Sequence, residues 1–174
     1  MGIQFETDYN METLTAMAKG LRKTVRKKRS RRVHIFAAVV LILGLLTILA
    51  TTAGGEPFGA CGVVTMLAML VVILVSLFED KLNAWFARKR LLPGTEHAVA
   101  TFEEDGYVSA TGVTESRFSY AQIVAVAETA RYFVFALSSH HTQAYDKRTI
   151  RGGSVEDFRA FIAEKTGKLV ENIK

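Results

Sequence analysis

Cysteine is almost absent from this chain of 174 residues, which contains only Cys61. One cysteine excludes a disulfide within a single chain. It also excludes any metal site that needs two thiolates, such as the common structural zinc sites. We therefore expect a fold that is held together by packing, without disulfides.

The motifs of common enzyme classes are also missing. The sequence has no G-x-S-x-G, no phosphate-binding glycine loop and no H-E-x-x-H. His140 and His141 are adjacent, with Asp146 nearby, but neighbouring residues in an extended turn point apart, and no second set of ligands accompanies them. The acidic run at 103–105 lacks the spaced ligands of a calcium loop. We expect no catalytic residues, no cofactor and no metal, and therefore no enzyme.

Charge is absent from two long stretches, 33–53 and 60–78, which contain no Asp, Glu, Lys or Arg. As a helix, each would be about 30 Å long, the thickness of the hydrocarbon core of a bilayer. The six residues between them are rich in glycine and proline and predict a tight turn. Residues 33–78 are therefore predicted to form a transmembrane hairpin. A cleaved signal peptide is a poorer interpretation, because a second span follows the first at once.

Basic residues flank both spans, whereas the connecting loop carries only Glu56. Because lysine and arginine near span ends stay on the cytoplasmic side, we expect a multi-pass protein of the cytoplasmic membrane with two spans and both termini in the cytoplasm. This rule alone accounts for the basic cluster, so a specific lipid or nucleic-acid site is not required there. The residues expected at the membrane interface are Arg31, Arg32, Trp85, Arg88, Lys89 and Arg90.

The segment 1–32, before the first span, predicts a short strand over 2–9 and then a helix. Asn10 can cap that helix, and Leu14, Met17, Leu21 and Val25 follow at helical spacing. We expect the helix to continue into the first span. Residues 79–94 predict an extension of the second span that ends at Pro93-Gly94, with Trp85 either at the membrane interface or packed against the soluble domain.

Small residues recur along one face of each span and could pack the two helices together. On the first span they are Ala37, Gly44, Thr47 and Thr51, and on the second Thr65, Ala68, Val72 and Ser76. No charged residue is buried in either span, which argues against an ion or proton pathway within one chain.

Residues 95–174 predict a small α+β domain of antiparallel strands closed by one helix. The expected strands are 98–102, 107–111, 117–120, 123–128, 132–138 and 142–145, and the helix covers 155–166 between a Ser154 cap and Gly167. We expect one bent sheet, to which the N-terminal strand adds an edge. This block holds nine Lys and Arg against eleven Asp and Glu, so we expect no nucleic-acid partner.

Three segments of this block resemble the YcxB-like family of small bacterial membrane proteins. They are the acidic turn 103–106, the aromatic segment 118–123, and the turn 146–150 with its following helix at 156–161. Asp146 and Ile150 depart from the proline and phenylalanine usual in the family. The resemblance implies a two-helix hairpin and a C-terminal domain similar to a pleckstrin-homology (PH) fold, but it implies little about activity.

Lys147, Arg148 and Arg151 lie just before the expected C-terminal helix and could meet an anionic headgroup or phosphorylated ligand there. The alternative is a solvated basic turn whose cations pair with nearby acids.

Two functions remain open from the sequence. One is a membrane-anchored, non-catalytic binding module that presents the soluble domain to membrane lipids or a protein partner. The other is a structural or protective membrane subunit, such as an accessory component of a transport complex or a self-immunity protein, in which the spans would be the working surface. Self-association fits either hypothesis.

Overall fold

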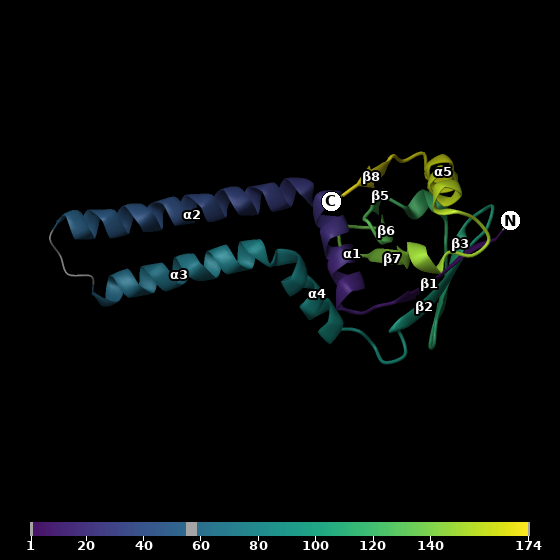
Figure 1. The fold of residues 1–174 in the computed structure, drawn as a ribbon, viewed down its shortest axis with the longest axis horizontal. Coiled ribbons are helices and arrows are strands. Elements are labelled where there is room, and N and C mark those ends of the chain that lie inside the picture. The colour runs from purple at the N-terminus through teal and green to yellow at the C-terminus, as the bar shows by residue number, and fades with distance from the viewer. Residues whose placement is uncertain (1, 55–58, 174) are drawn as a thin grey trace.

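A long helical hairpin stands on an α+β domain in the computed structural model, which describes residues 2–54 and 59–173 (Figure 1). The hairpin consists of α2 (Lys27–Ala53) and α3 (Ala60–Leu77), and the adjoining helices are α1 (Met11–Lys23) and α4 (Glu79–Lys89). The predicted turn between the spans falls mostly on 55–58, outside the described residues. The α+β class predicted from the sequence is confirmed.

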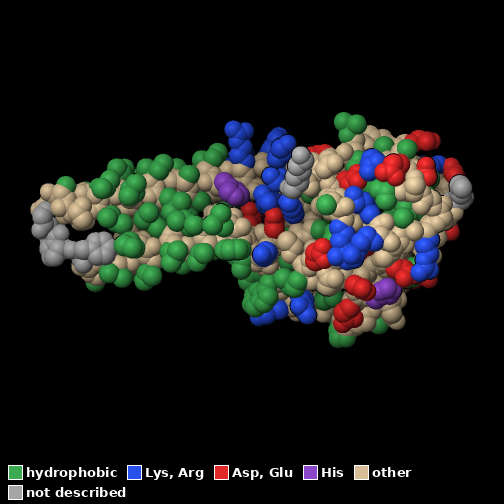
Figure 2. Space-filling view, viewed as in Figure 1, with side chains coloured by type: hydrophobic (Ala, Val, Ile, Leu, Met, Phe, Trp, Pro, Cys, Tyr) green, Lys and Arg blue, Asp and Glu red, His purple; other side chains and the backbone are tan. Residues whose placement is uncertain are grey.

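Both α2 and α3 are long and apolar enough to cross a membrane, and the most apolar part of each is uncovered by the rest of the chain. In a soluble protein, such helices would be buried in a core. Here hydrophobic side chains cover the hairpin surface, as Figure 2 shows. These features indicate a membrane protein with two passes.

The two long helices contact each other through small residues, as predicted. Gly44 faces α3 so closely that a Cβ there would lie 2.7 Å from the Met69 sulfur. Thr65, Val72 and Ser76 of α3 are half-buried. Absence of a side chain at Gly44 therefore lets the helix backbones approach.

The predicted faces were wrong at Thr47, Thr51 and Ala68, which are exposed. The half-buried row on α2 runs from Gly44 to Ile48, four residues on, so Thr47 turns outward. Its hydroxyl donates to the carbonyl of Leu43 at 2.9 Å, which satisfies the polar group within its own helix.

The N-terminal helix does not continue into the span, contrary to the prediction. Helix α1 ends at Lys23, and the chain turns over 24–26 before α2 begins. The Thr24 hydroxyl donates to the Gly20 carbonyl at 2.8 Å. Figure 1 shows α1 running across the base of the hairpin. The sequence favours helix on both sides of the turn, but docking of α1 on the domain requires the chain to change direction there.

Two four-stranded sheets build the domain, where the sequence pattern suggested one bent sheet. The first is antiparallel, in the order β1 (Ile3–Asp8), β2 (His97–Phe102), β3 (Tyr107–Thr111) and β4 (Glu115–Phe118). The second has the order β7 (Thr142–Asp146), β6 (Tyr132–Ala136), β5 (Ala125–Glu128) and β8 (Val170–Asn172), with β8 parallel to β5.

The N-terminal strand forms an edge of the first sheet, as predicted. Strand β1 pairs with β2 from Ile3 opposite Phe102 to Asp8 opposite His97. The backbone of Gln4 also exchanges two hydrogen bonds of 2.9 Å with Arg151. Segments before and after the hairpin thus form one domain.

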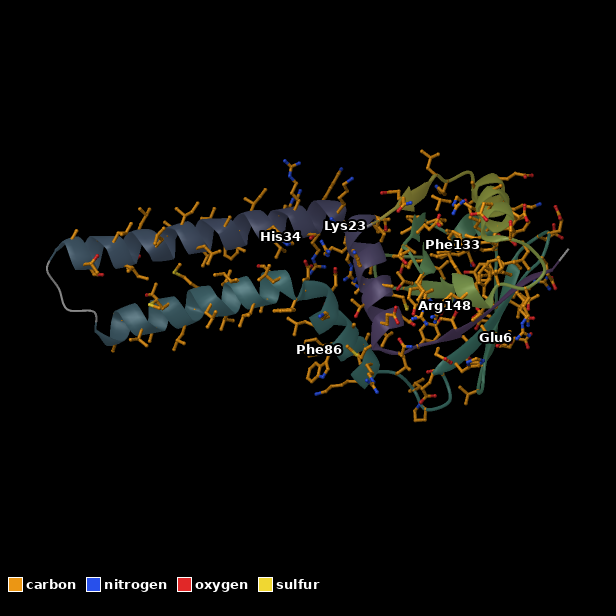
Figure 3. All side chains as sticks on the ribbon, in the orientation of Figure 1. Glu6, Lys23, His34, Phe86, Phe133 and Arg148 are labelled. Carbon is orange, nitrogen blue, oxygen red and sulfur yellow. The ribbon has the colours of Figure 1, made fainter. Side chains whose placement is uncertain are left out.

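An aromatic core lies between the two sheets and helix α5 (Val155–Thr166). Its fully buried members include Phe5, Phe102, Tyr107, Phe133 and Phe158. Figure 3 shows Phe133 inside the domain. On the other face of the second sheet, Ala16 and Met17 of α1 pack against a smaller apolar cluster. Strand β6 is therefore buried along its whole length.

Helix α5 has the predicted bounds and caps. The Ser154 hydroxyl accepts from the Asp157 amide at 3.0 Å, and the Asp157 carboxylate accepts from the Ser154 amide at 3.0 Å. Gly167 ends the helix with φ +62°, a conformation that favours glycine.

The strand predicted at 117–120 has different bounds in the structure, where β4 covers Glu115–Phe118. A 3₁₀ turn, η1 (Tyr120–Gln122), follows. The Tyr120 hydroxyl donates to the carbonyls of Glu103 and Gly106 at 2.6 and 3.0 Å, which fastens the acidic turn to the domain. A second 3₁₀ turn, η2 (Lys147–Thr149), follows β7.

Candidate functional site

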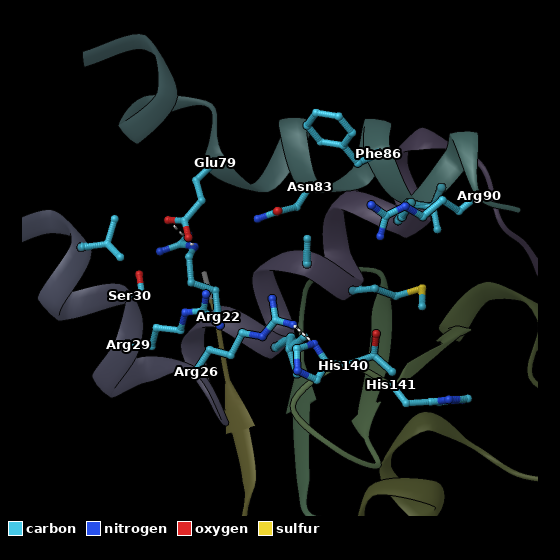
Figure 4. A pocket seen from close by; sticks show the side chains of 17 residues that line it. Arg22, Arg26, Arg29, Ser30, Glu79, Asn83, Phe86, Arg90, His140 and His141 are labelled. Carbon is cyan, nitrogen blue, oxygen red and sulfur yellow. Dashed lines mark hydrogen bonds and ion pairs between the residues drawn. The ribbon is translucent and has the colours of Figure 1, made fainter. Parts of the chain in front are cut away.

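A cavity of about 580 Å³ lies where the hairpin meets the domain (Figure 4). Its walls come from α1, the bend at 24–26, the first turns of α2, helix α4 and the turn between β6 and β7. Its volume is typical of small-molecule sites. Four arginines and one carboxylate line it: Arg22, Arg26, Arg29, Arg90 and Glu79.

Arg26 is held in place by the turn between β6 and β7. Its Nε donates to the Ser139 carbonyl at 2.6 Å, and its Nη2 lies 2.9 Å from His140 Nδ1. A guanidinium carries only donors, so His140 Nδ1 is the acceptor in this contact. The arrangement orients Arg26 and occupies one of the two ring nitrogens of His140.

Arg22 joins α1 to α4 through a bidentate pair with Asp80, at 2.7 and 2.6 Å. These hydrogen bonds raise the pKa of Arg22 above its usual value. Glu79 lies 3.8 Å from Arg22 and 3.9 Å from His34. Asp80 is therefore engaged by Arg22, and Glu79 lies between Arg22 and His34.

Arg29 and Arg90 are placed differently. Neither forms an ion pair with a carboxylate of residues 2–54 or 59–173. Both side chains are exposed to the cavity and solvent. The cavity therefore keeps an uncompensated positive charge, and an anion is the ligand that it suits best.

The predicted interface residues divide between the cavity and the outer surface. Arg90 lines the cavity, whereas Arg31, Arg32, Arg88 and Lys89 are exposed outside it. In Figure 2, Lys and Arg side chains gather where the hairpin joins the domain. In Figure 3, Lys23 and His34 mark that junction.

Trp85 lies on the exposed side of α4, whereas Ala84 is fully buried. The Lys89 ammonium sits 3.6 Å from the centre of the Trp85 ring, a cation–π contact. Packing of Trp85 into the domain, one of the two alternatives, is therefore wrong. Its place at a membrane interface stays a prediction.

The three cations near α5 are each paired with a carboxylate of the domain. Lys147 lies 2.9 Å from Glu128, Arg148 lies 3.0 Å from Asp146, and Arg151 lies 3.0 Å from Glu6. These contacts fit the alternative of a basic turn that pairs with nearby acids. An anionic ligand at Lys147, Arg148 and Arg151 stays a prediction, and it would have to compete with these pairs.

In the sequence, Arg22, Arg26 and Arg29 belong to the basic residues before the first span, which predicted only its orientation, and His140 and His141 were weighed only as metal ligands. The spacing of 22, 26 and 29 is a helical one, but the chain turns at 24–26, so this spacing did not indicate how the three side chains lie. Their convergence with Arg90 and the β6–β7 turn depends on contacts between distant segments.

Comparison with known proteins gives one finding. Residues 102–162 match the family model of the YcxB-like proteins, and this range includes the β6–β7 wall of the cavity. No curated protein and no solved structure matches the chain. The likeness to a PH fold therefore stays a prediction. The resemblance noted from the sequence is confirmed over this range: residues 102–162 are similar to the YcxB-like proteins, in a chain with two helices of membrane-spanning length.

Proposed function

We propose that this protein is a membrane-anchored, non-catalytic binding module. It holds its α+β domain and the basic cavity against the inner face of the cytoplasmic membrane. The observation that carries the proposal is the position of the cavity: Val33, the first residue of the charge-free stretch, is part of its wall. Cations at this depth face the anionic headgroups of the cytoplasmic leaflet.

The pairing of β1 with β2 supports a hairpin topology. These strands precede and follow the two long helices, so both flanks must lie on the same side of a membrane. The basic residues on both flanks favour the cytoplasmic side.

The chemistry of the cavity supports binding rather than turnover. Four of its charged groups are guanidiniums, which remain protonated and cannot act as general bases. Of the other titratable groups in its wall, Glu79 lies 3.8 Å from Arg22 and His140 lies 2.9 Å from Arg26. The guanidiniums can hold and orient an anion.

Site-specific photocrosslinking in cells tests the proposal. A photoreactive residue at Met17, on the cavity wall, is expected to capture a lipid or protein that mass spectrometry then identifies. The same residue at Leu92, exposed outside the cavity, is the matched control and should not capture it. Equal capture from both positions, or none from Met17, would contradict the proposal.

A photoreactive residue at a third position distinguishes the binding module from the alternative function. If only a probe at Leu46, on the exposed surface of α2, captures a protein in stoichiometric amount, the spans are the working surface. The protein would then be a structural or protective membrane subunit.

A further inference from the structure

We infer that the cavity binds the phosphate-bearing headgroup of an anionic phospholipid drawn from the surrounding leaflet. This inference rests on the proposed function and names the ligand of the same site. It follows from three features: the unpaired arginines, the orientation of Arg26, and the apolar residues beside them.

The unpaired arginines supply the charge. Arg29 enters the cavity from α2 and Arg90 from the C-cap of α4, at opposite ends of the view in Figure 4. Planar guanidinium groups match the oxygens of a phosphate and bind it through paired hydrogen bonds. Cations from two separate segments therefore line the space that a headgroup would occupy.

Arg26 adds a preoriented donor set. Its Nε and Nη2 are occupied by Ser139 and His140. These two contacts fix the plane of the guanidinium and therefore also the directions of its remaining N–H donors. A donor that is already fixed loses less side-chain entropy when an anion binds.

Apolar residues distinguish a lipid from a free anion. Val33 of α2 and Phe86 of α4 line the cavity together with the arginines. Inorganic phosphate would leave the exposed parts of these side chains in contact with water, whereas the glycerol and upper acyl chain of a phospholipid would cover them. The mixed lining therefore fits an amphiphilic anion.

The single tryptophan provides a reporter in the full-length protein. Trp85 neighbours Phe86, with 5.0 Å between their ring centroids. We would reconstitute the chain in phosphatidylcholine nanodiscs with a trace of phosphatidylglycerol that carries a dansyl group on its acyl chain, and measure energy transfer from Trp85. Unlabelled phosphatidylglycerol is expected to displace the probe, whereas phosphatidylcholine, glycerol phosphate and inorganic phosphate are not.

Substitution of the two unpaired arginines tests the site itself. The double variant Arg29→Gln/Arg90→Gln is expected to bind the probe about tenfold more weakly or worse, since each charge-assisted hydrogen bond contributes measurably to affinity. The matched control is Arg32→Gln/Arg88→Gln, which removes the same charge from the same two helices outside the cavity. Its effect should be small and should disappear at high salt, because exposed charges are screened.

Three results would overturn the inference. Equal weakening in the two double variants would assign the effect to general surface charge. If glycerol phosphate or inorganic phosphate displaced the probe as effectively as unlabelled phosphatidylglycerol does, the cavity would be a site for soluble anions. Probe binding indifferent to headgroup charge would remove the role of the arginines. If Met17 nevertheless captures a protein in cells, the binding-module proposal survives and only the lipid assignment fails.

Discussion

Replacing Phe5 with alanine is expected to destabilise the domain by about 3–5 kcal/mol, the cost of removing a phenylalanine from a close-packed core. Phe5 is fully buried although it precedes the hairpin in the sequence. Its ring lies 4.6–6.4 Å, between centroids, from those of Phe102, Phe133, Tyr145 and Phe158. The loss would be a large fraction of the stability of an ordinary domain.

Hydrogen exchange of the full-length protein in detergent micelles would measure this effect. Amides of β2 and β6 should exchange faster in Phe5→Ala, because both strands border the cavity left by the ring. Gln4→Ala on the same strand is the control, since the bonds of Gln4 to Arg151 come from the backbone and remain. Unchanged protection in Phe5→Ala would mean that β1 is dispensable to the domain.

Replacing Glu128 with glutamine is expected to cost about 3 kcal/mol, because it leaves two cations beside a buried neutral group. The Glu128 side chain is only 6% exposed. It accepts from Arg159 at 2.7 and 2.8 Å and from Lys147 at 2.9 Å. The carboxylate thereby joins β5, the turn after β7 and helix α5.

Glu103→Gln is the matched control for this substitution. It removes an exposed carboxylate whose partner, Arg117, is also exposed, at 51% and 68%. Exposed pairs contribute at most about 1 kcal/mol. Comparable destabilisation of the two variants in chemical denaturation would show that burial of Glu128 has no energetic consequence.

The same carboxylate makes stability depend on pH. Hydrogen bonds from Arg159, and then from Lys147, lower the pKa of Glu128 from 4.5 to about 2. Since the pKa is lower in the folded state, the contribution of Glu128 is complete above about 4.5 and is lost as the pH falls towards about 2. The difference in unfolding free energy between wild type and Glu128→Gln should therefore narrow across this interval. A constant difference would contradict the assigned ion pairs.

Local signals in the sequence determined much of the fold. The charge-free stretches determined the two long helices, because an uncharged hydrophobic run of that length is typical of a membrane-spanning helix. Ser154, Asp157 and Gly167 determined the ends of α5, because capping groups act within one turn. Alternation of residues likewise placed β3 at 107–111.

Only the tertiary structure decided how these elements meet. The bend at 24–26 arises because α1 docks on the second sheet while α2 leads away from it, and the short strand β8 exists because Val126 of β5 offers a partner to Val170. The basic cavity is lined by Arg29, Arg90 and His140, which lie far apart in the chain. The sequence by itself placed the basic residues next to two helices long and apolar enough to cross a membrane. The convergence of these basic residues on one cavity required the packing of α1 against α4 and the domain, because contacts between distant segments leave no local pattern.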